Sequence, residues 1–175
     1  QVNYLDNKLL NFIVIKQIQI TMKAKILLAI VSLLLFISCN KSSVFSEFDK
    51  MPTDNRWQKS DVKIYEFSID DNSKLYNLDF KFSHIYDYQF DSVPINFVIE
   101  SPSGKTEKFA IDLMIKDDSG KELGECSVDI CDLNFKIKEA SKLEKGTYKI
   151  TISNGFKREY LPNVLGIGLD VDAIK

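Results

Sequence analysis

The sequence predicts an all-β protein: an antiparallel β-sandwich of about eight strands, immunoglobulin-like or jelly-roll-like in type. Apolar and polar side chains alternate through much of the chain after residue 56, as they do in strands that bury one face. Short stretches rich in Gly, Pro, Asp and Asn separate these runs, and such residues favour turns. Helical spacing of apolar residues is hard to find there. A sheet closed into a barrel is the alternative fold.

The composition excludes several classes of function. The chain has 175 residues, of which 45% are hydrophobic and 27% charged, and its net charge is -2, values typical of a globular domain. Its 23 basic residues against 25 acidic ones leave no excess to neutralise phosphates, so we expect no nucleic-acid partner. His84 is the single histidine, which excludes zinc motifs that need two histidines. We expect no metal, no cofactor and no small-molecule substrate.

The first 38 residues divide into two segments. Residues 1–21 contain no Gly, Ala, Pro or Arg and precede the first methionine, and we interpret them as translated upstream sequence that is not part of the protein. Residues 22–38 hold two lysines followed by an apolar run from Ile26 to Ile37, the pattern of a signal peptide. This run is shorter than the roughly 20 apolar residues that a membrane-spanning helix needs.

The end of this signal peptide predicts a lipid anchor. Residues 35–39 read Leu-Phe-Ile-Ser-Cys and resemble the lipobox of bacterial lipoproteins, in which the cysteine becomes the acylated first residue of the mature protein. The resemblance implies lipidation at Cys39 and stable anchoring, because the added acyl chains bury more CH₂ groups than a single chain does. An ordinary cleaved signal with an incidental cysteine is the alternative. No acidic run of the kind that resembles the surface-export tags of some bacterial lipoproteins follows Cys39, and we therefore expect the periplasmic face of the outer membrane.

Charge alone would not hold this protein at a membrane. Residues 1–38 contain four lysines and one aspartate, and their removal leaves 19 basic and 24 acidic residues, a net charge of -5. An acidic domain is repelled by anionic lipid headgroups. We therefore expect the lipid at Cys39 to provide the attachment.

The mature chain is expected to begin with a flexible segment and continue as one domain. Residues 39–56 are rich in polar residues and predict a lipidated cysteine with a flexible tether. Residues 57–175 form the predicted sandwich, which is long enough to bury a core without a metal or disulfide. The expected strands are 65–69, 76–82, 95–99, 109–115, 126–130, 133–137, 148–152 and 167–171.

Several short stretches from residue 57 onward occur in a characteristic order: Trp57-Gln58-Lys59, Tyr76-Asn77-Leu78, residues 86–90, residues 101–105, residues 118–124, Gly146-Thr147-Tyr148 and residues 165–169. Their order and spacing resemble the gliding motility lipoprotein (GldH) family of Bacteroidetes. The resemblance implies a non-enzymatic outer-membrane lipoprotein, an accessory or assembly component of the gliding motility and type IX secretion machinery, with envelope proteins as partners. A carbohydrate-binding lipoprotein of a glycan-uptake system is the alternative.

Two cysteines follow the predicted lipidation site. On one continuous strand, five steps of about 3.3 Å would place Cys126 and Cys131 about 16 Å apart on opposite faces, beyond the reach of a disulfide. They can pair only if Asp129 and Ile130 make a turn. Two separate small core residues are the default expectation.

Aromatic residues are the candidates for partner binding. Tyr86, Tyr88 and Phe90 lie two residues apart and would share one face of a strand. Such a face is either part of the core, as in many half-buried strands, or a flat contact surface for a protein or a sugar. Trp57, at the start of the domain, has the same two interpretations.

Catalysis is not expected from the remaining polar residues. His84 would need a neighbouring nucleophile, and no Gly-x-Ser-x-Gly motif supplies one, so we expect a polar residue at a strand end. The pairs Asp70-Asp71 and Asp117-Asp118 lack the alternating ligand spacing of a calcium loop. Hairpin turns explain both pairs.

Overall fold

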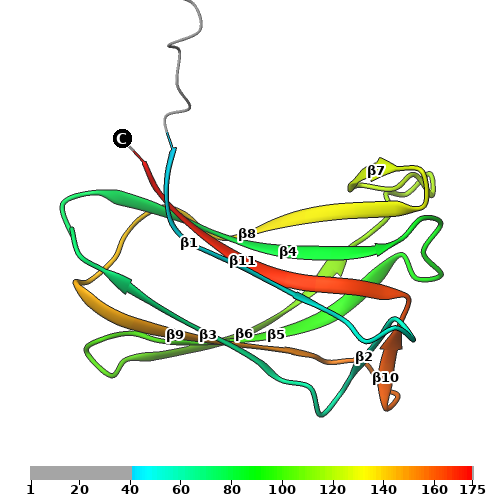
Figure 1. The fold of residues 1–175 in the computed structure, drawn as a ribbon, viewed down its shortest axis with the longest axis horizontal. Coiled ribbons are helices and arrows are strands. Elements are labelled where there is room, and N and C mark those ends of the chain that lie inside the picture. The colour runs from blue at the N-terminus through cyan, green and yellow to red at the C-terminus, as the bar shows by residue number, and fades with distance from the viewer. Residues whose placement is uncertain (1–40, 175) are drawn as a thin grey trace, which may run out of the picture. The chain divides into compact units, whose positions relative to one another are not determined.

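The computed structural model describes residues 41–174, which consist of strands, turns and loops without a helix (Figure 1). The strands are β1 (Lys41–Lys50), β2 (Arg56–Gln58), β3 (Lys63–Ile69), β4 (Leu75–Ile85), β5 (Ser92–Glu100), β6 (Thr106–Met114), β7 (Glu125–Ser127), β8 (Ile130–Lys142), β9 (Gly146–Asn154), β10 (Tyr160–Pro162) and β11 (Val164–Ile174). Within residues 41–174, no helix could cross a membrane. The predicted upstream segment 1–21, the signal peptide 22–38 and Cys39 lie outside the described residues.

The strands form two antiparallel sheets that face each other (Figure 1). One sheet has the order β1-β11-β4-β8-β7 and the other has the order β3-β9-β5-β6, while β2 and β10 pair as a separate ribbon. The chain passes directly from one sheet to the other between β3 and β4, between β4 and β5, between β6 and β7, and between β8 and β9. It also crosses by way of β2, between β1 and β3, and by way of β10, between β9 and β11. The predicted antiparallel sandwich is therefore confirmed, and the barrel alternative is wrong.

The core lies between the two sheets and follows the predicted alternation. Along β5, Val93, Ile95, Phe97 and Ile99 are buried while the residues between them are half-exposed. The ring of Phe97 meets that of Phe80 from the opposite sheet edge-to-face, with centroids 5.4 Å apart, an arrangement that aromatic pairs favour. Seven of the eight predicted strands fall on observed strands to within one residue. The exception, 126–130, contains a turn.

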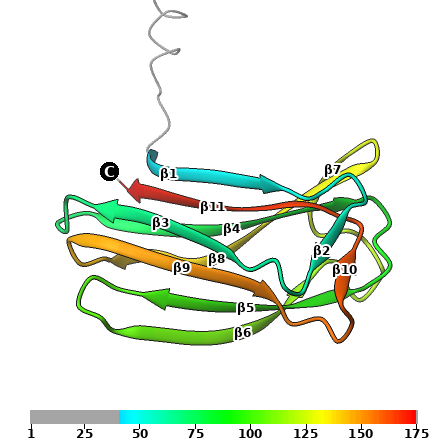
Figure 2. The same cartoon turned by 60° about the horizontal axis from the view of Figure 1, so that its bottom comes forward.

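The predicted flexible tether over residues 39–56 is wrong for most of its length. Residues 41–50 form β1, which pairs with β11 along its whole length (Figure 2). Phe45 packs against Tyr65 and Phe67, with ring centroids 6.3 and 5.7 Å away, and the Tyr65 hydroxyl donates to Asp49 Oδ2 at 2.8 Å. The strand lies at a sheet edge with much of it exposed, so it lacks the alternation that predicts strands from sequence.

One glycine of β11 permits the close approach of β1. A Cβ atom on Gly168 would lie 2.5 Å from the carbonyl oxygen of Glu47 and 2.9 Å from the ring of Phe48. The backbone of Glu47 cannot retreat without losing its ladder pairing with Leu169. A side chain at position 168 would therefore push β1 off the sheet.

The sandwich has two ends that differ in structure. At the end that we call the terminal end, β1 begins and β11 finishes, and residues 70–74, 101–105 and 143–145 form short connections. At the opposite end, which we call the hairpin end, lie the loops 86–91, 115–124 and 155–159 together with the β7–β8 hairpin (Figure 1). The β2–β10 ribbon also lies at the hairpin end.

Candidate functional site

Tyr86, Tyr88 and Phe90 do not form the flat contact surface that was one of the two interpretations of their spacing. Tyr86, Tyr88 and Phe90 lie on the loop between β4 and β5, and Asp87 takes a positive φ of 55°, which breaks the two-residue alternation of a strand. Tyr88 is buried, and its hydroxyl donates to the carbonyl oxygen of Pro162 at 2.8 Å. Burial raises the pKa of Tyr88 well above its usual value. Only Tyr86, at 54% exposure, is open to solvent.

The other two aromatic candidates also belong to the interior. Phe90 is half-buried and packs on Phe156, with ring centroids 5.0 Å apart. Trp57 is fully buried, and its indole Nε1 donates to the carbonyl oxygen of Asp61 at 2.8 Å. For Trp57, Tyr88 and Phe90 the core interpretation is correct, and the prediction that they form a contact surface is wrong.

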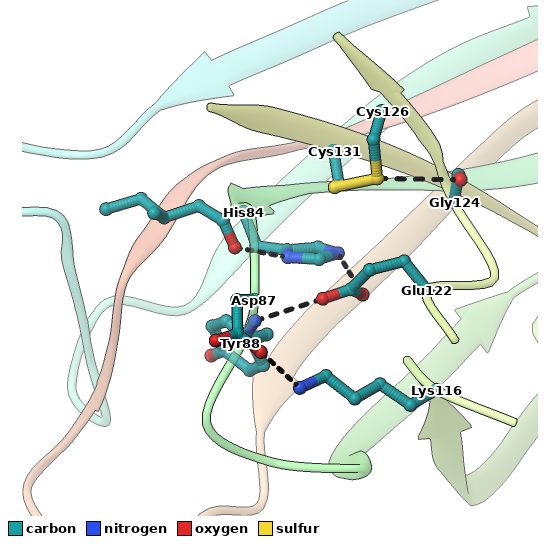
Figure 3. The surroundings of a disulfide bond; sticks show 9 residues. His84, Asp87, Tyr88, Lys116, Glu122, Gly124, Cys126 and Cys131 are labelled. Carbon is teal, nitrogen blue, oxygen red and sulfur yellow. Dashed lines mark hydrogen bonds and ion pairs between the residues drawn. A yellow bond between two sulfur atoms is a disulfide. The ribbon is translucent and has the colours of Figure 1, made fainter. Parts of the chain in front are cut away.

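Cys126 and Cys131 form a disulfide across the β7–β8 hairpin (Figure 3). The two cysteines are directly paired in the ladder, because the chain turns at Val128 and Asp129, one residue earlier than the position considered from the sequence. Val128 takes a positive φ of 56°, which a β-branched residue rarely adopts. The default expectation of two separate core residues is therefore wrong.

His84 lies next to this disulfide and is fully buried. It occupies the end of β4, directly opposite Cys131 of β8 in the sheet register. Its Nδ1 lies 2.9 Å from the carbonyl oxygen of Ile85, and because a carbonyl only accepts, Nδ1 carries the hydrogen. The other ring nitrogen, Nε2, points at Glu122, with 4.0 Å between Nε2 and Oε2 (Figure 3).

Glu122 links this buried region to the loop 115–124. Its side chain is 9% exposed, and its Oε1 accepts a hydrogen bond from the backbone N–H of Tyr88 at 3.0 Å. Within residues 41–174, its Oε2 and the Nε2 of His84 have no hydrogen-bond partner. A cation bound by both atoms would satisfy both.

The loop 115–124 is held in shape by further polar contacts. The carboxylate of Asp117 accepts hydrogen bonds from Ser119 Oγ and from the backbone N–H groups of Ser119 and Lys121, which hold its pKa below the usual value. Lys116 Nζ donates to Asp87 Oδ1 at 2.9 Å, and this contact raises the pKa of Lys116. As predicted from the sequence, Asp117 and Asp118 belong to a turn.

A pocket of about 300 Å³ opens beside the disulfide. Its lining includes Glu122 and Cys126, together with Tyr86, Asp87, Gly120, Lys121 and Gly124. Three exposed apolar side chains lie in the loop 115–124 and the β7–β8 hairpin: Leu123, Val128 and Ile130, at 50%, 89% and 47% exposure. The hairpin end therefore combines a buried polar group, a pocket and exposed apolar surface.

Sequence reasoning missed the pairing of His84 with Glu122. The two residues are 38 positions apart, and no spacing rule joins them. The only signal was the presence of one histidine in a run of otherwise strand-like residues, which we interpreted as a polar strand end. The strand-end position is confirmed, whereas the burial of the ring was not anticipated.

Comparison with known proteins identifies the family. A family model described as GldH lipoprotein matches residues 43–171, which is most of the chain. The chain belongs to the GldH lipoprotein family. It is 27% identical over 153 residues to the gliding motility lipoprotein GldH of Flavobacterium johnsoniae, covering 83% of this chain and 94% of that protein. The resemblance inferred from the order of motifs is thus confirmed, and the protein is a gliding motility lipoprotein by family.

Solved structures show weaker similarity. Dimeric latent PorU from Porphyromonas gingivalis aligns with 76% of this chain and 13% of its own length, at 9% identity and a TM-score of 0.34. The complex of TmCBM61 with β-1,4-galactotriose aligns with 77% of this chain and 84% of its own, at 15% identity and a TM-score of 0.33. Similarities at this level carry no argument about function.

Proposed function

We propose that this GldH-family lipoprotein is a non-enzymatic subunit of the gliding motility and type IX secretion machinery, anchored through Cys39 at the periplasmic face of the outer membrane. Membership of the GldH lipoprotein family supports the lipid anchor and the link to gliding. The hairpin end is the part of the molecule that contacts an envelope protein of the machinery.

The position of the first strand supports this orientation. Only Asn40 separates Cys39 from the start of β1 at Lys41, and two extended residues span at most about 7 Å. A short link of this length would hold the terminal end next to the membrane. The ten residues of β1 extend about 33 Å at 3.3 Å per residue, so the hairpin end would face away from the lipid and toward other proteins.

The observation that carries the proposal is the exposed apolar surface at that end. Val128 is 89% exposed and its neighbour in the hairpin, Ile130, is 47% exposed. Clustered apolar side chains at a protein surface mark interaction sites. Residues 122–135 also contain four acidic residues and no basic one, so a partner with an apolar and basic surface would complement this region.

The non-enzymatic part of the proposal rests on the state of the reactive groups. The two sulfur atoms of Cys126 and Cys131 are bonded to each other, so neither is a nucleophile in this form. The ring of His84 is buried between the sheet and the loop 115–124. This arrangement presents no activated nucleophile to a substrate in the pocket.

The carbohydrate-binding alternative loses its main support. A sugar-stacking face requires several exposed aromatic rings on one surface. Of the four aromatic candidates, Trp57 and Tyr88 are buried and Phe90 is half-buried, which leaves Tyr86 alone. A single exposed tyrosine does not make a platform.

A pair of matched substitutions tests the docking proposal. Ile130→Asp places a charge on the hairpin, whereas Ile64→Asp makes the same change at a similarly exposed position, 53%, on β3. We expect Ile130→Asp to abolish co-purification of machinery proteins after gentle detergent extraction of cells, with identification by mass spectrometry. Ile64→Asp should leave the yield at the wild-type value. Equal yields from both variants would contradict the proposal.

A further inference from the structure

Three potential metal-ligand atoms meet beneath the hairpin end. The Nε2 of His84, a carboxylate oxygen of Glu122 and the Sγ of Cys131 all lie within 4.8 Å of one another. His84 and Cys131 are fully buried, and the side chain of Glu122 is 9% exposed. Two of the three atoms, His84 Nε2 and Glu122 Oε2, are buried without a hydrogen-bond partner in the described part of the chain.

We propose that this cluster is a zinc site that opens when the Cys126–Cys131 disulfide is reduced. The ligands are His84 Nε2, Glu122 Oε2 and the thiolate of Cys131, with the thiolate of Cys126 as the fourth. Nitrogen, oxygen and thiolate donors are the set that Zn²⁺ prefers, in tetrahedral geometry. The disulfide and the metal exclude each other, because both use the sulfur of Cys131.

The side chains are already oriented as metal ligands. The hydrogen bond from His84 Nδ1 to the carbonyl oxygen of Ile85 fixes the tautomer that leaves the lone pair of Nε2 directed at Glu122. Metal-ligating histidines are commonly held by such a bond from the second ring nitrogen. Glu122 is fixed in the same way, since Oε1 accepts from the N–H of Tyr88 and Oε2 remains free for a cation.

The distances require an adjustment on the order of 1 Å. Bonds of about 2.0–2.2 Å from zinc to nitrogen and oxygen place two tetrahedral ligands about 3.4 Å apart. His84 Nε2 and Glu122 Oε2 are 4.0 Å apart. Glu122 lies on a loop, and a movement of about 0.6 Å of its carboxylate closes this difference. The three ligand atoms, including Cys131 Sγ, lie within 4.8 Å of one another, and Zn–S bonds of about 2.3 Å require them to draw together by about 1 Å.

The disulfide is accessible from one side, which allows it to be opened. Cys126 is exposed whereas Cys131 is buried, so a thiolate of a dithiol reductant reaches the sulfur of Cys126. Its attack breaks the S–S bond, forms a mixed disulfide with Cys126 and releases Cys131 as a thiolate beside His84. The second thiol of the reductant then displaces Cys126, so the reductant leaves as a disulfide and the protein gains two electrons.

A metal ion can reach the ligands from the same exposed side, at Cys126. The pocket beside the disulfide is lined by both Glu122 and Cys126, which connects the buried ligands to solvent. Binding of Zn²⁺ to the reduced form displaces any remaining protons from the two cysteines. In the oxidised form only His84 and Glu122 are left, too few ligands for a structural zinc site.

Metal titration of the purified full chain in detergent tests the proposal. Zn²⁺ is added in competition with a chromophoric chelator, to oxidised protein and to protein reduced with a phosphine. We expect one Zn²⁺ per reduced chain, bound at least about 100-fold more tightly than to the oxidised chain. Co²⁺ in place of Zn²⁺ should give the absorption of a tetrahedral site with thiolate-to-metal charge transfer. Equal affinity of the two forms, or a Co²⁺ spectrum without thiolate bands, would overturn the proposal.

Variants assign the ligands without relying on the reductant. Cys126→Ser leaves Cys131 as a free thiol and should bind Zn²⁺ in the absence of any reductant. Adding Glu122→Gln to that variant, which keeps the acceptor for Tyr88, should weaken binding at least about 100-fold, whereas Glu125→Gln on the same hairpin should not. Unchanged affinity with Glu122→Gln would remove Glu122 from the site and contradict the proposed ligand set.

Discussion

The two ends of the sandwich are built from the same sheets but differ in what they hold. At the terminal end the connections are short and close-fitting: Gly146 has a φ of 129°, and a Cβ there would lie 2.7 Å from Pro102. At the hairpin end the loops are longer, and they carry a disulfide, a buried His84–Glu122 pair and exposed apolar side chains. The proposed function accordingly assigns partner contact to the hairpin end.

The largest effect should come from removing a buried aromatic ring of the hairpin end. Tyr88→Ala removes a side chain that packs on Phe82 and Phe90 and bonds to Pro162. We expect it to lower the free energy of unfolding by about 3–5 kcal/mol. Tyr86→Ala, two residues away and exposed, should change it by less than about 0.5 kcal/mol. Denaturant unfolding measures both, and similar losses would contradict the assignment of Tyr88 to the core.

A smaller effect should follow from opening the disulfide. The bond closes a loop of only a few residues, since the cysteines are five positions apart, and loop-closure entropy then gives about 2 kcal/mol. Cys126→Ser should lower the free energy of unfolding by about this amount. In metal-free buffer, hydrogen exchange followed by mass spectrometry should show faster exchange in residues 122–133 and no change in residues 70–75. Faster exchange at both ends would mean that the bond stabilises the whole sandwich.

The smallest effect on stability should come from replacing an aspartate in either of two similar turns, one at each end of the sandwich. Asp71 accepts from the backbone N–H and the hydroxyl of Ser73, and Asp117 accepts the same pair of bonds from Ser119 and one more from the N–H of Lys121. These bonds hold the pKa of both carboxyl groups below the ordinary 3.8, and the hydrogen bond from the serine hydroxyl has the largest effect. Asp117→Ala should therefore destabilise the protein more than Asp71→Ala at pH 7, as measured by denaturant unfolding.

The pH dependence of both turns has a defined sign. Because the folded-state pKa is lowered, the unfolded chain takes up the proton first as the pH falls. The stabilisation is therefore complete above about pH 5 and is lost as the pH falls through the folded-state pKa below 3.8. The gap in stability between wild type and Asp117→Ala should shrink below pH 3. A gap that stays constant below that pH would contradict the role of the ionised carboxylate.

The fold was largely predictable from the sequence because core strands leave a periodic signal. The run from Tyr76 to Phe82 alternates strictly between apolar and polar residues, and it forms part of β4 as predicted. β1 left no such signal, because it lies at the edge and buries little beyond Phe45. The position of the β7–β8 turn could not be predicted from the sequence, because its first residue, Val128, has a positive φ and valine is not a residue type that favours hairpin turns.

The site was far less predictable than the fold. The family resemblance depended on the order of motifs, which survives in a sequence, and it is confirmed. The contact of His84 with Glu122 depends on how the loop 115–124 folds back onto β4, which no local pattern encodes. The prediction that Tyr86, Tyr88 and Phe90 share one face of a strand was wrong because Asp87 adopts a positive φ. Tyr86 and Tyr88 consequently point to different environments.

Site-specific photo-crosslinking in intact cells tests the central claim most directly. A photoreactive residue at position 128, on the hairpin, is compared with one at position 64, on the exposed face of β3. The account predicts a discrete crosslink from position 128 to an envelope protein of the gliding and secretion machinery, and none from position 64. Crosslinks of equal strength from both positions, or a crosslink from position 64 alone, would contradict it.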